Sequence, residues 1–131
     1  QVPDLKSPMS EPIFEITKAA AFDAAHFLEE GPPDHRYRRM HGHSFKVEAT
    51  IRGERPDGQA WLADLDSLNV ALGAVAAELD HGLLNDKPGL ERPTLEELCL
   101  HFAAKLRPQF PNLSKVVVSR PTVGETCALN L

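Results

Sequence analysis

The sequence predicts an α+β fold in which two helices pack on one face of a four-stranded antiparallel sheet. Polar and apolar side chains alternate over residues 13–26 and 43–52, which is typical of strands with one buried face. Apolar side chains then recur at helical spacing over residues 65–79 and 95–106, and two short strands follow. An order of two strands, two helices and two strands indicates helices and sheet in separate layers. At 131 residues, we expect a single domain over residues 13–131.

The N-terminal half supplies the first strand pair. Residues 1–12 fit neither strand nor helix, so we expect a disordered arm or a remnant of expression. The strand over residues 13–26 contains small side chains at 19–25 that let a neighbouring strand approach closely. Residues 29–39 are polar and contain two prolines, which predicts a loop leading into the second strand.

The boundaries of the two helices are marked by capping residues. Asp64 is a suitable N-cap for the first helix, and Gly82 is a natural terminator after it. Thr94 and Glu97 predict a capping box for the second helix, which ends before Pro108. Residues 83–89 are predicted as loop, residues 116–118 and 126–131 as strands, and residues 120–124 as the turn between them.

The composition excludes several classes of function. A net charge of −5 argues against a nucleic-acid surface, and no stretch is apolar enough for a membrane span. The one basic cluster precedes the second strand, where it either attracts an anion locally or forms a solvated loop; its members are Arg36, Arg38 and Arg39. Cys99 and Cys127 lack metal-type or disulfide spacing and are expected to be core residues of a cytoplasmic protein.

Three histidines form a candidate metal site. His41 and His43 are two residues apart on the second strand, so both imidazoles project to the same side. Pairing with the first strand would bring His26 beside them. Three neutral nitrogen ligands suit Zn²⁺ and leave one position open for water or substrate. The alternative is a chance His-x-His pattern, with His26 a hydrogen-bonded core residue.

Five motifs in this order give the chain a wider resemblance; they lie at residues 22–26, 41–47, 61–64, 79–85 and 93–97. They are similar to motifs of the 6-pyruvoyl-tetrahydropterin synthase and 6-carboxy-tetrahydropterin synthase family. The resemblance implies the tunnelling fold, in which subunits join their sheets into a barrel, usually a hexamer built from two trimers. It also implies Zn²⁺ on His26, His41 and His43 and a lyase reaction on 7,8-dihydroneopterin triphosphate. The spacing of residues 79–85 favours the queuosine-precursor branch of the family.

An Asp-His pair takes part in proton transfer in such enzymes, and Asp80-His81 matches it. A carboxylate raises the basicity of a neighbouring imidazole, which already titrates near neutral pH. The alternative is a histidine that is favoured at a helix C-terminus by the helix dipole.

The chain departs from the family pattern at the position of the usual catalytic cysteine, four residues before His41, where it has Tyr37. A phenol ionises at higher pH than a thiol, so Tyr37 would need help to act as a base. His35 could replace the cysteine if the loop folds over the metal, although a loop histidine is more often solvated.

A second departure concerns the glutamate that usually binds the pterin edge. Aligned without gaps, that position is Arg120, which cannot accept hydrogen bonds. Glu125 could replace the glutamate if the turn is longer here, or it is an ordinary turn carboxylate.

These observations leave three functional hypotheses. The first is a zinc-dependent lyase of the 6-carboxy-tetrahydropterin synthase type, with Tyr37 or His35 replacing the cysteine. The second is a diverged relative in which Arg120 binds an anionic substrate. The third is a non-catalytic zinc-binding module, whose closed site would need a fourth protein ligand such as His35.

Overall fold

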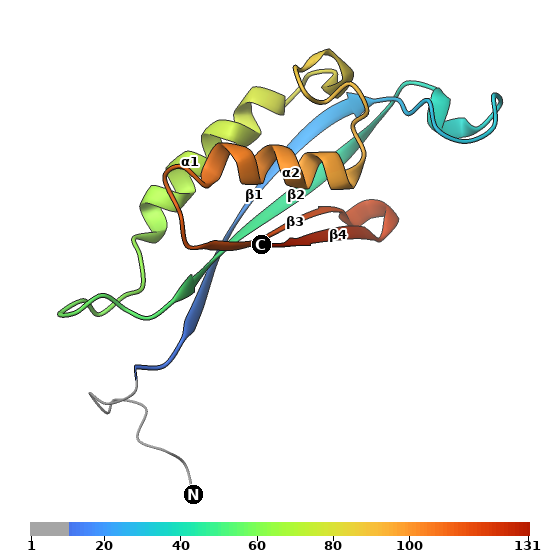
Figure 1. The fold of residues 1–131 in the computed structure, drawn as a ribbon. Coiled ribbons are helices and arrows are strands. Elements are labelled where there is room, and N and C mark those ends of the chain that lie inside the picture. Colours follow the sequence, from blue (N-terminus) through green and yellow to red (C-terminus); the bar gives the residue numbers. More distant parts are fainter. Residues whose placement is uncertain (1–10) are drawn as a thin grey trace, which may run out of the picture.

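The structure, a computed structural model, describes residues 11–131, so the arm predicted at the N-terminus lies almost entirely outside the described residues. Four strands form one antiparallel sheet in the order β1-β2-β3-β4. The strands are β1 (Phe14–His26), β2 (His41–Gly53), β3 (Leu113–Arg120) and β4 (Glu125–Asn130). The predicted fold class is confirmed (Figure 1).

The register between β1 and β2 determines which side chains share a face of the sheet. His26 lies opposite His41, and Phe22 lies opposite Phe45. Because side chains alternate between faces, these residues belong to one face, and Asp23 belongs to the other. Phe22 and Phe45 are buried and stack with ring centroids 5.0 Å apart, so the face that carries the histidines is continuous with the core.

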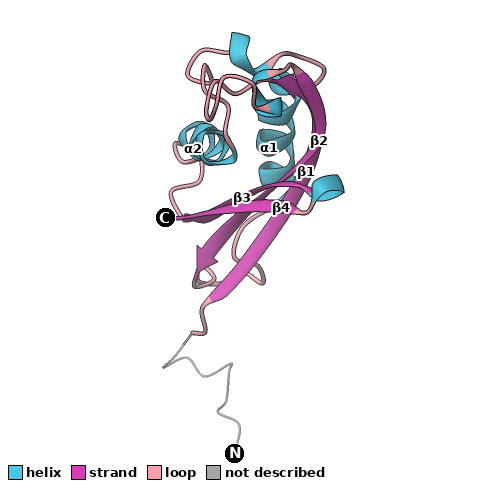
Figure 2. Cartoon of the chain, turned by 90° about the vertical axis from the view of Figure 1, so that its right-hand side faces the viewer, coloured by secondary structure: helices cyan, strands magenta, loops and turns pink. Residues whose placement is uncertain are grey.

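Both long helices cover this buried face, as Figure 2 shows. They are α1 (Leu65–Leu79) and α2 (Leu95–Leu106). Asp64 caps α1 by accepting a hydrogen bond from the backbone N–H of Asp66, as the sequence predicts. Thr94 accepts from the N–H of Glu97, but its own N–H donates to the carbonyl of Arg92, so the predicted capping box forms on one side only.

The predicted end of the first helix is wrong in one detail. His81, and not Gly82, takes the left-handed backbone conformation after α1, with φ 57°. The backbone N–H of His81 donates to the carbonyl of Asp23 at 2.6 Å, and the N–H of Ala25 donates to the carbonyl of Gly82 at 2.9 Å. The segment after α1 therefore lies along the outer edge of β1, next to His26.

Three predicted loops or turns contain short 3-10 helices. These are η1 (Arg36–Arg38), η2 (Leu84–Asp86) and η3 (Pro121–Val123). The third strand was predicted at residues 116–118 and is longer in the structure, where it runs from Leu113 to Arg120. Across residues 11–131, no helix is long and apolar enough to cross a membrane.

The two cysteines lie between α2 and the sheet. Cys99 is fully buried, and its thiol is 3.4 Å from the carbonyl oxygen of Cys127. Burial raises the pKa of Cys99 to about 11, so this thiol stays protonated at neutral pH.

Candidate functional site

Strands β1 and β2 bring three histidines together where the two strands end and begin. One nitrogen from each of His26, His41 and His43 can be chosen so that all three lie within 4.8 Å of one another. The Nε2 atoms of His26 and His41 are 3.1 Å apart. Within residues 11–131, this is the one group of His, Cys, Asp or Glu side chains placed to share an ion. The predicted clustering of the three imidazoles is present.

Backbone carbonyls set the tautomers of two of these imidazoles. The Nδ1–H of His26 donates to the carbonyl oxygen of Pro93 at 3.1 Å, and that of His41 donates to the carbonyl oxygen of Arg39 at 2.7 Å. A carbonyl can only accept, so Nδ1 carries the proton in both rings and Nε2 carries the lone pair. The two Nε2 lone pairs therefore face each other.

The third imidazole completes a donor set that fits a metal ion. The Nε2 of His43 is buried and has no hydrogen-bond partner among the described residues. An unpartnered buried nitrogen is costly, and two lone pairs 3.1 Å apart repel each other. A cation between the three rings would remove both penalties, so the residues fit a divalent metal.

Burial favours the neutral form of His26 and His43, which is the form that binds a metal. It lowers the pKa of His26 to about 4, against a weaker opposing effect of the hydrogen bond to Pro93. Burial also lowers the pKa of His43, and the charge of Arg120 lowers it further. Phe45 lies under the cluster, with its ring centroid 5.6 Å from that of His43, and separates it from the rest of the core.

A cavity of about 440 Å³ opens beside the histidines. Tyr37 lines it from the loop before β2, and Arg120 and Glu125 line it from the β3–β4 turn, together with His41 and His43. The structure thus brings Tyr37, at the usual cysteine position, and both candidates for the pterin edge into one cavity with His41 and His43.

Arg120 and Glu125 face each other across the β3–β4 hairpin, as register partners at its closed end. The Nε of Arg120 is 2.9 Å from Oε1 of Glu125, an ion pair whose N–H direction falls outside hydrogen-bond geometry. The arginine side chain is 13% exposed and the glutamate side chain 44% exposed. Because Gly124 takes a left-handed φ of 68°, the turn closes within η3 and leaves room for a six-residue β4 after it.

His35 has a local contact within the loop. Its Nδ1 accepts a hydrogen bond from the backbone N–H of Tyr37 at 3.2 Å, and the two rings pack with centroids 4.1 Å apart. His35 is not among the residues that line the cavity at the histidines. The arrangement of the loop therefore gives no support to the predicted catalytic role of His35. His35 is also not one of the three histidines that could share a metal ion.

Asp80 and His81 form a hydrogen-bonded pair at the end of α1. Oδ2 of Asp80 is 2.8 Å from Nδ1 of His81, and Oδ1 accepts from the backbone N–H of Asp23 at 2.9 Å. The hydrogen bond that His81 donates to Asp80 raises the pKa of His81, and the hydrogen bond donated by the N–H of Asp23 lowers the pKa of Asp80. The imidazole is 80% exposed, so its Nε2 is free to exchange protons.

A second cavity, of about 630 Å³, is lined by His81 on one side and by His43 of the histidine cluster on the other. His81 lines it together with Asp23, Ser44 and His43, and His43 also lines the first cavity. His81 and Tyr37 therefore line different cavities within the chain, and His43 belongs to both.

Three supporting residues were given no role by the sequence analysis. Asp23 accepts a hydrogen bond from the hydroxyl of Ser44 at 2.5 Å in addition to binding Asp80 through its N–H. The side chain of Asn85 accepts from the N–H of Phe27 and donates to its carbonyl, which fixes the chain just after His26. All three residues lie in the motifs that carry the family resemblance, which was the available signal.

Comparison with known proteins identifies related sequences over most of the chain. A family model described as 6-pyruvoyl tetrahydropterin synthase matches residues 15–130. A 6-carboxy-5,6,7,8-tetrahydropterin synthase of Synechocystis sp. is 36% identical over 120 residues, which cover 86% of this chain and 86% of that protein. A dihydroneopterin monophosphate aldolase of Pyrococcus furiosus is 32% identical over 96 residues, covering 73% of this chain and 77% of that protein.

Solved structures show the same fold. The 6-pyruvoyl tetrahydropterin synthase of Caenorhabditis elegans superposes with a TM-score of 0.80 over 92% of this chain and 96% of that one, at 22% identity. The fold, the motifs and the match over residues 15–130 lead to one conclusion: the chain belongs to the 6-pyruvoyl tetrahydropterin synthase family.

Proposed function

We propose that this protein is a zinc-dependent lyase of the 6-carboxy-tetrahydropterin synthase type that acts on 7,8-dihydroneopterin triphosphate. The observation that carries the proposal is the cluster of three imidazoles with Nε2 lone pairs beside a cavity that also holds Tyr37 and Glu125. The relative from Synechocystis sp. carries the same activity in its name.

His26, His41 and His43 would hold the zinc ion, and the carbonyls of Pro93 and Arg39 keep two of the rings in the required tautomer. When bound there, zinc supplies Lewis-acid chemistry that makes the hydroxyls of the substrate side chain more acidic. Burial of His26 and His43 favours their neutral form, so protons compete less with the ion for these two rings.

Glu125 would bind the pterin ring. Its carboxylate can accept hydrogen bonds from the amino group and the ring N–H of the pterin, and Arg120 can donate to the neighbouring ring carbonyl. The ion pair between them supports this role, because it holds the carboxylate at the cavity wall next to a donor. An arginine in the usual glutamate position is then compatible with pterin binding.

His81 would exchange protons with the substrate through Nε2. Asp80 holds the proton of the neutral ring on Nδ1 and leaves the Nε2 lone pair as the base. Tyr37 lines the metal-side cavity and would supply a hydroxyl where the family usually has a thiol.

The exposed position of His81 supports assembly of several chains. β1 and β4 are the two edge strands of the sheet, and such edges commonly pair with other subunits. We propose a homohexamer, a dimer of trimers, in which another subunit covers His81. Light scattering of the purified protein measures the mass of the assembly and so tests the number of subunits.

The experiment that tests the function incubates the zinc-loaded full chain with 7,8-dihydroneopterin triphosphate and follows substrate loss by chromatography. We expect turnover by the wild type, loss of turnover with retained zinc in His81→Ala, and loss of zinc in His43→Ala. His101→Ala, which replaces a histidine on α2, is the matched control and should keep both zinc and turnover. A wild type that binds zinc and leaves the substrate intact after long incubation would refute the proposal.

A second candidate is a related reaction on a different phosphorylated substrate. The relative from Pyrococcus furiosus is named as an aldolase for a pterin monophosphate, and this chain has Tyr37 in place of cysteine. Aldol cleavage of the three-carbon side chain would release a two-carbon aldehyde that keeps the phosphate, whereas the synthase reaction releases inorganic triphosphate. Analysis of the phosphorus-containing product by ³¹P NMR therefore separates the two reactions.

A further inference from the structure

The two walls of the cavity at the histidines differ in charge. On the hairpin wall, the charge of Arg120 is balanced by Glu125, 2.9 Å away. On the loop wall, Arg36 and Arg39 line the same cavity, and within residues 11–131 neither has a carboxylate within 4.0 Å. The loop wall therefore presents two uncompensated positive charges beside a cluster of neutral imidazoles.

The loop is held in a conformation that keeps these two arginines at the cavity. Arg38, which lies between them, has a structural contact instead: its guanidinium donates to the carbonyls of Gly31 and Pro32 at 2.8 and 2.9 Å. The guanidinium of Arg36 lies over the Tyr37 ring, 5.6 Å from its centroid. The carbonyl of Arg39 accepts from Nδ1 of His41, which fixes its backbone next to the metal site.

Guanidinium groups without a carboxylate partner are suited to phosphate oxygens. Each can donate two parallel hydrogen bonds to one phosphate, and charge-assisted bonds of this kind are stronger than neutral ones. The one acidic side chain that lines this cavity, Glu125, belongs to the opposite wall and is paired. A phosphate chain would therefore be attracted by the arginines of the loop wall and repelled by the carboxylate of the hairpin wall.

We propose that Arg36 and Arg39 form a phosphate subsite, which fixes the direction in which the substrate lies in the cavity. The phosphates bind against the loop, the pterin ring lies against Arg120 and Glu125, and the carbon atoms between them pass the three histidines. The assignment of the ring to the hairpin wall rests on the proposed function. The phosphate subsite itself depends only on the charges and positions of the loop arginines.

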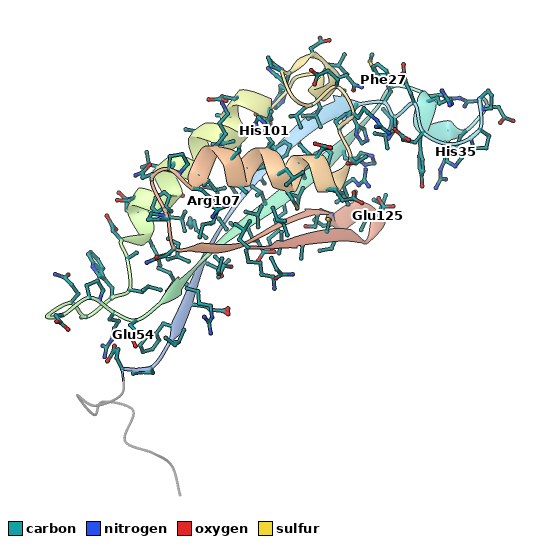
Figure 3. The ribbon with its side chains drawn as sticks, viewed as in Figure 1. Phe27, His35, Glu54, His101, Arg107 and Glu125 are labelled. Atoms are coloured by element: carbon teal, nitrogen blue, oxygen red, sulfur yellow. The ribbon has the colours of Figure 1, made fainter. Side chains whose placement is uncertain are left out.

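The test is calorimetric titration of the zinc-loaded full chain with inorganic triphosphate, with zinc content measured afterwards because triphosphate also chelates zinc. We expect Arg36→Gln and Arg39→Gln each to weaken binding at least about tenfold, and the double variant to weaken it further. Arg107→Gln is the matched control, because this exposed arginine lies at the end of α2 away from His35 and Glu125 (Figure 3). It should bind triphosphate as the wild type does.

Absence of triphosphate binding by the wild type would overturn the subsite, and so would equal binding by the double variant or an equal loss in Arg107→Gln. The last result would mean that triphosphate responds only to overall charge. Phosphate-free neopterin, followed by its fluorescence, is the second probe. The affinity for neopterin should be unchanged in the double variant and reduced in Glu125→Gln. A reduction in both variants would mean that the loop arginines do not act by binding the phosphates.

These measurements separate the subsite from the proposed function. If triphosphate binding depends on Arg36 and Arg39 but no pterin triphosphate is consumed, the subsite stands and the synthase activity fails. If the double variant turns over 7,8-dihydroneopterin triphosphate with an unchanged KM, the activity stands and the subsite fails.

Discussion

Acidification of the metal-free protein should destabilise it through His26 in particular. The side chain is fully buried, and burial lowers its pKa to about 4, whereas an imidazole in the unfolded chain has a pKa near 6.5. Between these values the unfolded state binds a proton that the folded state does not. The free energy of unfolding therefore keeps the full contribution of His26 above pH 6.5 and loses it as the pH falls towards 4.

The pKa difference sets the size of the effect. A fall from 6.5 to about 4, at 1.36 kcal/mol per pKa unit, gives about 3 kcal/mol. The assay is urea unfolding of chelator-treated protein between pH 7 and pH 4 at one protein concentration. His26→Asn is the comparison, since its amide can still donate to the carbonyl of Pro93 but does not titrate.

We expect the wild type to lose about 3 kcal/mol more than His26→Asn over this range. Burial also lowers the pKa values of His43 and His101, but both proteins contain these groups, so their effect largely cancels in the difference. Parallel loss of stability in the two proteins would refute the claim that a buried neutral imidazole at this position controls the acid response.

Three further predictions concern other parts of the chain. Asp80→Asn removes the carboxylate that raises the pKa of His81, so the limb of the pH–rate profile that reports His81 should move to lower pH; an unmoved limb would mean that another group titrates there. Iodoacetamide should alkylate Cys127 well before the buried Cys99, whose pKa is raised to about 11, as followed by peptide mass spectrometry; equal rates would contradict the packing of α2. Thr94→Ala removes the acceptor for the N–H of Glu97 and should lower the free energy of unfolding by about 1 kcal/mol in urea, whereas no measurable change would show that the N-cap contributes nothing.

The histidine cluster could be predicted from the sequence because it depends on short-range geometry. His41 and His43 share a face through strand alternation alone, and pairing of adjacent strands brings His26 opposite His41. The same holds for the N-caps Asp64 and Thr94, whose side chains bond to backbone groups two or three residues away. In each case the interaction partners are local or follow from one strand pairing.

Contacts between distant segments could not be predicted in this way. The hydrogen bond from His26 to the carbonyl of Pro93 joins residues far apart in sequence, and any residue offers a carbonyl. The placement of Glu125 depended on where the β3–β4 turn closes, and the left-handed Gly124 closes it so that Glu125 pairs with Arg120. The end of α1 was missed because His81 takes a left-handed conformation that is usual for glycine, held by its N–H bond to Asp23.

The attachment of the segment after α1 to β1 means that one strand positions two chemically different groups. Asp23 anchors Asp80 and His81, and His26, three residues later on the same strand, belongs to the imidazole cluster. A slip of β1 by one residue against β2 would turn His26 to the opposite face and shift the anchor of the acid-base pair in the same movement. Damage to the hydrogen-bond ladder between these strands would thus disable both halves of the site together, even where every side chain of the site is intact.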